Sequence, residues 1–486
     1  MSTRSRVPEN AVLLSSSQFV RTAVGFLFFL FLARRLGPDE YGRYMFAFAL
    51  SEIFSIAGDV GLHEYSIREI ARRPEELSRR LVGILVLKTL LSSCSAVIMV
   101  AIVPLMGKDS STSMAVAAFA IAQIGYSWFY ASTITFSVRQ DLHIQAFLWL
   151  LEKLLYAGAG AAVLLAGYNF VAVAFSNTFV QFAGGILGVL IAWRKYGPYV
   201  MRLDRQKWLP YLKAALPFGL IVAFYLVYFR VDSVMISFFR GDAEVGQYNA
   251  AYTLVSALLF LPSGLVAALF PKLAGDYRSP TDNVDAPFQK AGRYLLVMSL
   301  PMAVGGWLLS GQLMGFLFGA KYLPAANALA VLAWTLPVWF ITFLQGNILT
   351  IIERQKAVAA VGLVNMIFNV LINLVIIPRY GFTGAAATTL VTEVLGILQM
   401  FYLLRRNISL AGTALMGLRI ALLSAAMGLL VWLLRDRLQV MVTVAVAAAA
   451  YGGAVLALRI IPLSELAAIL RRRPQPGEDE IGPVET

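Results

Sequence analysis

Cysteine and histidine are almost missing from this chain of 486 residues, which has one cysteine, Cys94, and two histidines, His63 and His143. A single thiol cannot form an intramolecular disulfide, and these three residues cannot supply the ligands of a structural zinc site. We therefore expect no disulfide, no metal site and no cofactor.

The motifs of common enzyme classes are absent as well. The sequence contains no G-x-x-x-x-G-K-[ST] phosphate loop, no H-E-x-x-H zinc motif and no G-x-S-x-G nucleophile elbow. The loops between its apolar runs are too short to fold into a catalytic domain. We therefore predict that the protein is not an enzyme and has no catalytic residues. Because the sequence has no phosphate loop for ATP, any transport against a gradient would have to be driven by an ion gradient or by the gradient of the substrate itself.

Charged residues are scarce, since 14% of the chain is charged and 59% is hydrophobic. This hydrophobic fraction exceeds what the core of one soluble domain needs, so most of the chain must be surrounded by lipid. The predicted fold class is an all-α polytopic membrane protein. Apolar runs predict about 14 transmembrane helices, near residues 12–33, 44–62, 81–105, 114–136, 146–166, 170–193, 214–239, 248–270, 294–318, 325–350, 357–378, 383–404, 415–434 and 439–461. No cleavage site of small residues follows the first run, so we expect it to be retained as a span rather than removed as a signal peptide.

The net charge of +13 comes from Lys and Arg in short segments beside the predicted spans. This distribution fixes membrane topology and attracts anionic headgroups, so we expect contact with membrane lipids and not with nucleic acid. The densest segments, 68–80, 194–213 and 471–473, share one side if the N-terminus is cytoplasmic. We therefore expect a multi-pass protein of the cell inner (plasma) membrane with both termini in the cytoplasm. The basic loop at 34–43 would then be a local exception on the outside.

A short motif in the first part of the chain recurs, in altered form, in the second part. The alignment pairs Glu40 with Glu244, Gly42 with Gly246, Tyr44 with Tyr248, Ala47 with Ala251 and Leu50 with Leu254. Such a repeat indicates two homologous membrane halves, as in transporters whose binding site lies between the halves. Chance similarity between apolar helices rich in Gly and Ala is the alternative.

Several motifs, in order along the chain, are similar to those of a known family. They are Arg35-Leu36-Gly37-Pro38 with Tyr41-Gly42, Gly61-Leu62 with Arg68-Glu69-Ile70-Ala71-Arg72, Phe318-Gly319 with Lys321-Tyr322, and Tyr380-Gly381-Phe382-Thr383-Gly384-Ala385-Ala386 ending at Glu393. Together they resemble bacterial polysaccharide biosynthesis proteins, the flippases of lipid-linked oligosaccharides and O-antigen. The superfamily of these flippases includes multidrug and toxic compound extruders and the flippase of the peptidoglycan precursor.

The resemblance implies two pseudo-symmetric six-helix bundles plus two C-terminal helices. We place the N-terminal bundle at 1–205, the C-terminal bundle at 206–408, the two additional helices at 409–465 and a disordered cytoplasmic tail at 466–486. It also implies a substrate: an oligosaccharide or repeat unit on polyprenyl pyrophosphate. This substrate would be moved from the cytoplasmic to the outer leaflet by alternating access, for surface polysaccharide biosynthesis. A polysaccharide polymerase and glycosyltransferases are the implied protein partners.

Charged residues inside the predicted spans are few, and each costs a few kcal/mol unless it has a partner or faces water. For a pyrophosphate-linked glycan we assign three cavity cations to the phosphates, because Arg and Lys can bind phosphate oxygens: Arg21, Arg230 and Lys153. The predicted polar and aromatic wall consists of Gln18, Tyr225, Tyr228, Asn365 and Asn369, and three further aromatic residues are candidates for stacking on sugars: Trp128, Tyr130 and Tyr156. Four carboxylates would balance the bases or bind a coupling H+ or Na+: Glu52, Asp59, Glu152 and Asp232.

These charges also have structural interpretations. Asp59 could pair with Arg21, Lys88 lies close enough to a span end to reach the interface, and the ladder of Asn365, Asn369 and Asn373 could serve interhelical hydrogen bonding. Two other functions stay open at this point. One is an ion-coupled multidrug exporter of the related fold, and the other is a noncatalytic scaffold for glycan assembly.

Overall fold

The computed structural model describes residues 6–197, 206, 208–264, 266 and 283–461, and side chains from residue 16 onward. Within this part of the chain there are helices and connections and no strand. The predicted tail at 466–486 lies outside the described residues. The α-helices are α1 (Arg6–Asp59), α2 (Leu62–Ala71), α3 (Leu77–Ile102), α4 (Ser110–Val138), α5 (Leu142–Leu165), α6 (Phe170–Tyr196), α7 (Trp208–Phe239), α8 (Asp242–Ala257), α10 (Asp285–Leu308), α11 (Ser310–Phe318), α12 (Ala326–Leu332), α13 (Thr335–Ile351), α14 (Gln355–Leu404), α15 (Leu410–Leu434) and α16 (Val440–Ala457).

The all-α membrane fold is confirmed, whereas the number of spans stays a prediction. Among the described residues, nine helices are long and apolar enough to cross a membrane, or up to eleven if two bent pairs each count as one span. The bent pairs are α10 with α11, at 82°, and α12 with α13, at 45°. The predicted spans 294–318 and 325–350 are therefore broken rather than straight.

Two long helices each contain a glycine that interrupts the helical backbone. Gly37 in α1 has φ 76° and ψ 173°, and Gly381 in α14 has φ 60° and ψ −146°. Glycine adopts positive φ without the steric cost of a Cβ, so the chain can turn sharply at both positions. The predicted spans 12–33 and 44–62 lie on either side of Gly37, and the predicted spans 357–378 and 383–404 lie on either side of Gly381.

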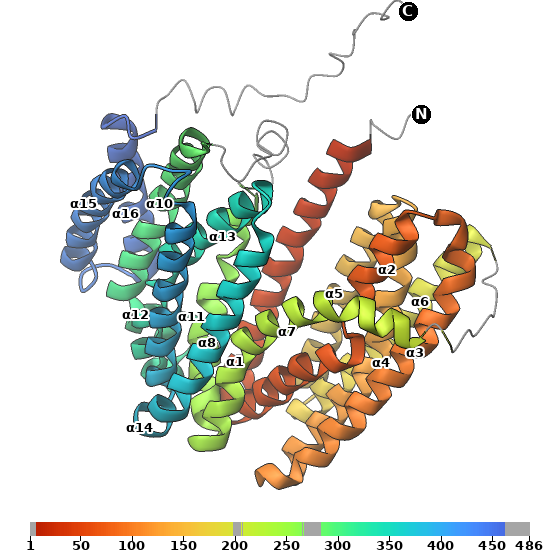
Figure 1. Cartoon of the computed structure of the whole chain (residues 1–486). Helices are drawn as coiled ribbons and strands as arrows, with labels where there is room; N and C mark the ends of the chain where they lie inside the picture. Colours follow the sequence, from red (N-terminus) through yellow and green to blue (C-terminus); the bar gives the residue numbers. More distant parts are fainter. Residues whose placement is uncertain (1–5, 198–205, 207, 265, 267–282, 462–486) are drawn as a thin grey trace, which may run out of the picture.

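The helices form two groups with α7 between them (Figure 1). In one group α4 packs on α3 and α6, and α5 packs on α6; in the other, α14 packs on α13, and α10 packs on α13 and α15. Helix α7 begins beside α2 and ends beside α8 and α14, and α1 contacts helices of both groups. The two copies of the repeated motif lie on α1 and α8, which pack directly against each other. The beginning of α1 and the end of α16 lie at the same end of the molecule (Figure 1).

Candidate functional site: adjoining cavities between the helices

The three predicted cations line one cavity. Arg21 of α1, Lys153 of α5 and Arg230 of α7 surround a space of about 250 Å³, together with Gln18. Gly25, one turn after Arg21, also lies on this wall, so the polar stripe of α1 faces the cavity. We call this space the cationic pocket. Its charged groups come from helices that are far apart in the sequence.

The contacts of these cations leave the cationic pocket with a surplus of positive charge. Arg230 forms an ion pair from Nε to Glu52 Oε2, and its guanidinium lies 5.2 Å from the Phe48 ring centroid. Arg21 Nη1 donates to Gln18 Oε1 at 3.3 Å, and its guanidinium lies 4.9 Å from the Trp149 ring. Among the described side chains, neither Arg21 nor Lys153 has a carboxylate within 4.0 Å.

The aromatic rings around Lys153 explain how a lysine is held here without a carboxylate. Its Nζ lies 5.7 Å from the ring centroid of Phe29 and 5.2 Å from that of Tyr156, distances at which a ring face attracts a cation. The neighbouring Glu152 turns to α6 instead, where its Oε1 accepts from Gln181 Nε2 at 2.8 Å. Glu152 therefore has a hydrogen-bonded partner of its own and does not line the described wall of the cationic pocket.

A larger cavity of about 830 Å³ adjoins the cationic pocket, and Gln18, Thr22 and Ser256 line both. We call it the aromatic cavity, because Tyr225, Tyr228, Phe229 and Trp339 lie on its wall. Asn365 and Glu393 also face this space. The predicted wall residues Gln18, Tyr225, Tyr228 and Asn365 are thus gathered around two neighbouring cavities.

Asp232 and Asn369 lie away from both cavities in a buried network. Asp232 is 4% exposed and accepts hydrogen bonds from Tyr248 at 2.8 Å, Thr389 at 3.1 Å and Asn373 at 2.7 Å. Asn373 also donates to Asn369 Oδ1 at 3.1 Å. The asparagine ladder therefore serves two purposes: Asn365 faces the aromatic cavity, and its two successors join α14 to α7 through Asp232.

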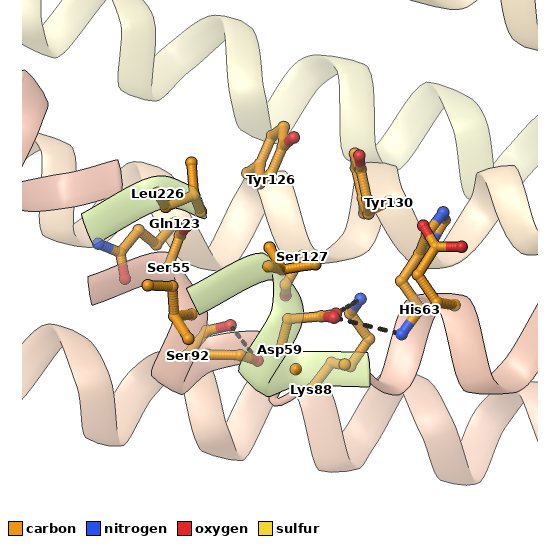
Figure 2. A pocket seen from close by; sticks show the side chains of 16 residues that line it. Ser55, Asp59, His63, Lys88, Ser92, Gln123, Tyr126, Ser127, Tyr130 and Leu226 are labelled. Carbon is orange, nitrogen blue, oxygen red and sulfur yellow. Dashed lines mark hydrogen bonds and ion pairs between the residues drawn. The ribbon is translucent and has the colours of Figure 1, made fainter. Parts of the chain in front are cut away.

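Asp59 and Lys88 line a third cavity, of about 150 Å³, at the junction of α1 and α2. Lys88 Nζ pairs with Asp59 Oδ1, and Asp59 Oδ2 accepts from the backbone N–H of His63 at 3.2 Å. Figure 2 draws both contacts, with Tyr126 and Tyr130 on the facing wall. Lys88 is 1% exposed, so the expectation that it reaches the interface is wrong, because an ion pair inside the protein satisfies its charge. Asp59 does not pair with Arg21, which lines a different cavity.

The three additional stacking candidates make contacts within the fold. The Tyr156 hydroxyl is bonded to that of Tyr44, the Trp128 indole N–H donates to Thr89 at 2.9 Å, and Tyr130 packs against His63 with ring centroids 4.1 Å apart. Sequence reasoning assigns Glu393 to the end of a motif and misses it as a site residue. The signal that could have found it is its position inside the apolar run 383–404, because a charge in a membrane span needs a partner or a cavity.

Long apolar helices that enclose adjoining cavities, one of them lined by charged side chains, are typical of membrane transporters. Residues 7–275 match the family model described as polysaccharide biosynthesis protein, and the chain belongs to this family.

Curated relatives agree with this membership. The chain is 22% identical over 390 residues to a protein of Haloferax volcanii named probable low-salt glycan biosynthesis flippase Agl15, covering 78% of this chain and 79% of that protein. It is 23% identical over 405 residues to a putative O-antigen transporter of Shigella flexneri, covering 78% of this chain and 93% of that protein. Both names describe transporters.

Solved structures share the fold. A structure of the lipid II flippase MurJ in an inward closed conformation matches with a TM-score of 0.76 at 15% identity, over 94% of this chain and 100% of that one. An inward-facing multidrug resistance MATE family transporter of the MOP superfamily matches with a TM-score of 0.58 at 13% identity, over 85% and 98% of the two chains. At these identities the likeness concerns the fold.

Proposed function

We propose that this protein is a flippase that moves an oligosaccharide or repeat unit, linked to polyprenyl pyrophosphate, from the cytoplasmic to the outer leaflet of the inner membrane. The observation that carries the proposal is the meeting of Arg21, Lys153 and Arg230 in one cavity. Family membership and the names of the relatives support the same function. Both termini would be cytoplasmic, and the transported glycan would be used for surface polysaccharide.

The cationic pocket has the chemistry that a pyrophosphate requires. Arginine offers a planar fork of N–H donors to phosphate oxygens and stays charged when it is removed from water. Arg21 has neutral partners, a long hydrogen bond to Gln18 and the ring of Trp149, so its donors can turn to a ligand at little cost. Arg230 would exchange Glu52 for phosphate oxygens, so its ion pair holds the guanidinium in place while the cavity is empty.

For transport we infer alternating access between two bundles, 1–205 and 206–408, with fourteen spans in all and α15 and α16 in the additional segment 409–465. Helices α1 and α8 pack directly against each other in this conformation, and this contact would be the closed gate of the proposed cycle. Separation of α1 from α8 would open the cationic pocket to the other side of the membrane. The polyprenyl tail would stay in lipid while the polar head passes between the bundles.

A leaflet-resolved assay with purified protein tests the proposal. Liposomes would carry a fluorescent short-chain polyprenyl pyrophosphate bearing N-acetylglucosamine, and quenching by an added reductant would report the fraction in the outer leaflet. We expect that fraction to rise faster with the protein than in empty liposomes, and to rise slowly with the double variant Arg21→Ala, Arg230→Ala. Equal rates in protein-containing and empty liposomes would refute the flippase and favour a scaffold. Movement of a cationic dye but not of this lipid would favour a multidrug exporter.

A further inference from the structure

The two adjoining cavities differ in the sign of their charge. The cationic pocket is lined by Arg21, Lys153 and Arg230, whereas the described residues around the aromatic cavity include no Lys, Arg or His. Among these described residues Glu393 is the one carboxylic acid, and it is 6% exposed. A phosphate group is therefore attracted to one end of the combined space and repelled from the other.

Glu393 is held by neutral groups. Its Oε1 accepts a hydrogen bond from the Tyr228 hydroxyl at 2.7 Å, and the indole of Trp339 lies beside the same carboxyl. No basic side chain lies within 4.0 Å of it in the described part of the chain. A carboxylate out of water and without a cation is costly unless donors satisfy its lone pairs, and Tyr228 satisfies one of them.

Two further polar atoms on the wall of the aromatic cavity have no hydrogen-bond partner among the described residues. Asn365 Oδ1 and Thr342 Oγ1 lie out of solvent without a hydrogen bond, and both residues line the aromatic cavity. Aromatic rings line the same cavity in contact with one another: the centroids of Tyr225 and Phe229 are 4.5 Å apart, and those of Phe229 and Trp339 are 6.1 Å apart. A wall of rings with a few convergent polar groups suits a ligand that has apolar C–H faces and many hydroxyls.

From this arrangement we propose that the aromatic cavity is a sugar subsite in which Glu393 determines specificity. The carboxylate accepts a hydrogen bond from a hydroxyl or amide N–H of a neutral or N-acetylated sugar next to the pyrophosphate, and it excludes an acidic sugar by like-charge repulsion. The inference rests on the proposed function, because the cationic pocket must hold the pyrophosphate for the sugar to reach the neighbouring space. The volume of about 830 Å³ falls within the range of pockets that enclose small ligands.

Binding to purified protein in lipid nanodiscs tests this subsite with three probes. They are a short-chain polyprenyl pyrophosphate without sugar, the same lipid carrying N-acetylglucosamine, and the same lipid carrying glucuronic acid. We expect wild type to bind the N-acetylglucosamine lipid more tightly than the glucuronic acid lipid. Glu393→Gln, which keeps the shape and an acceptor for Tyr228, should reduce this preference about tenfold or more and leave the affinity for the sugar-free lipid unchanged.

The control variant is Glu353→Gln, which neutralises an exposed glutamate between α13 and α14. It should retain the wild-type preference, and equal melting temperatures of both variants would show that the fold is intact. An unchanged preference in Glu393→Gln, with normal binding of the sugar-free lipid, would overturn the sugar subsite and leave the flippase proposal standing. Failure of wild type to bind any of the three lipids would overturn the proposed function itself.

Discussion

Gly42 of α1 and Gly246 of α8 cross so closely that neither position has room for a Cβ. A Cβ on Gly42 would lie 1.7 Å from the carbonyl oxygen of Asp242, and one on Gly246 would lie 1.9 Å from that of Pro38. The contact is reciprocal, because each glycine faces the carbonyl that stands four residues before the other glycine. Gly37 and Gly241 also share a conformation, with φ of 76° and 93° and ψ of 173° and 170°. The motif that recurs in the sequence thus supplies the two glycines at which α1 and α8 cross.

Gly42→Ala should force α1 and α8 apart. The added methyl would meet backbone atoms that cannot rotate away, so we expect a loss of about 1–3 kcal/mol, seen as a lower melting temperature in detergent. Gly158→Ala is the control, because a Cβ there has no other atom within 4 Å. If Gly42→Ala has the same melting temperature as wild type, the crossing of α1 and α8 is not tight.

Arg21→Ala and Arg230→Ala should each abolish surface polysaccharide in cells that depend on this protein, with normal amounts of protein in the membrane. Each loses a charged donor to phosphate, worth about tenfold or more in binding. Arg→Lys at either position should restore part of the polymer, since the charge remains and the fork is lost. Arg437→Ala, on the exposed turn before α16, should behave as wild type. Normal polymer in both Ala variants would remove these residues from the mechanism.

Asp59→Asn should destabilise the protein through Lys88. The Lys88 side chain is 2% exposed, so removing its partner leaves a buried charge uncompensated, at a cost of about 3–5 kcal/mol. The double variant Asp59→Asn, Lys88→Met removes both charges and should recover most of the lost melting temperature. If the single and double variants melt alike, Lys88 has another way to satisfy its charge.

Asp232→Asn should remove the dependence of transport on an ion gradient. The carboxylate receives three neutral donors and, among the described residues, has no cation within 4.0 Å, which suits an acid that exchanges H+ or holds Na+. Asparagine keeps the shape and loses the charge. We expect lipid flipping in liposomes to respond to an imposed H+ or Na+ gradient in wild type and in Asp436→Asn, whose carboxyl lies on the surface. A gradient response that survives in Asp232→Asn would exclude this residue as the coupling site.

Much of the fold followed from the sequence because the bilayer constrains each helix separately. The lengths of the apolar runs predicted the positions of the helices. The spacing of Gln18, Arg21 and Gly25 predicted that these three residues share one face of α1, and this face lines the cationic pocket. The breaks at Leu309 and before α13 were not predicted, since a bent apolar helix has the same composition as a straight one. The prediction for Lys88 was wrong for a related reason. The position of Lys88 along α3 indicates how deep it lies in the membrane, but it does not show that Asp59 lies beside it.

The sequence by itself determined that the protein is embedded in a membrane and that a motif recurs in two of its helices. It also determined which few charged residues lie in the membrane spans. Those properties depend on composition and on local periodicity. The tertiary structure alone decided that Arg21, Lys153 and Arg230 share one cavity while Asp59 pairs with Lys88 and Asp232 with neutral donors. The physical reason is that helix periodicity fixes the face on which a side chain lies, whereas the packing of distant helices fixes which face it meets.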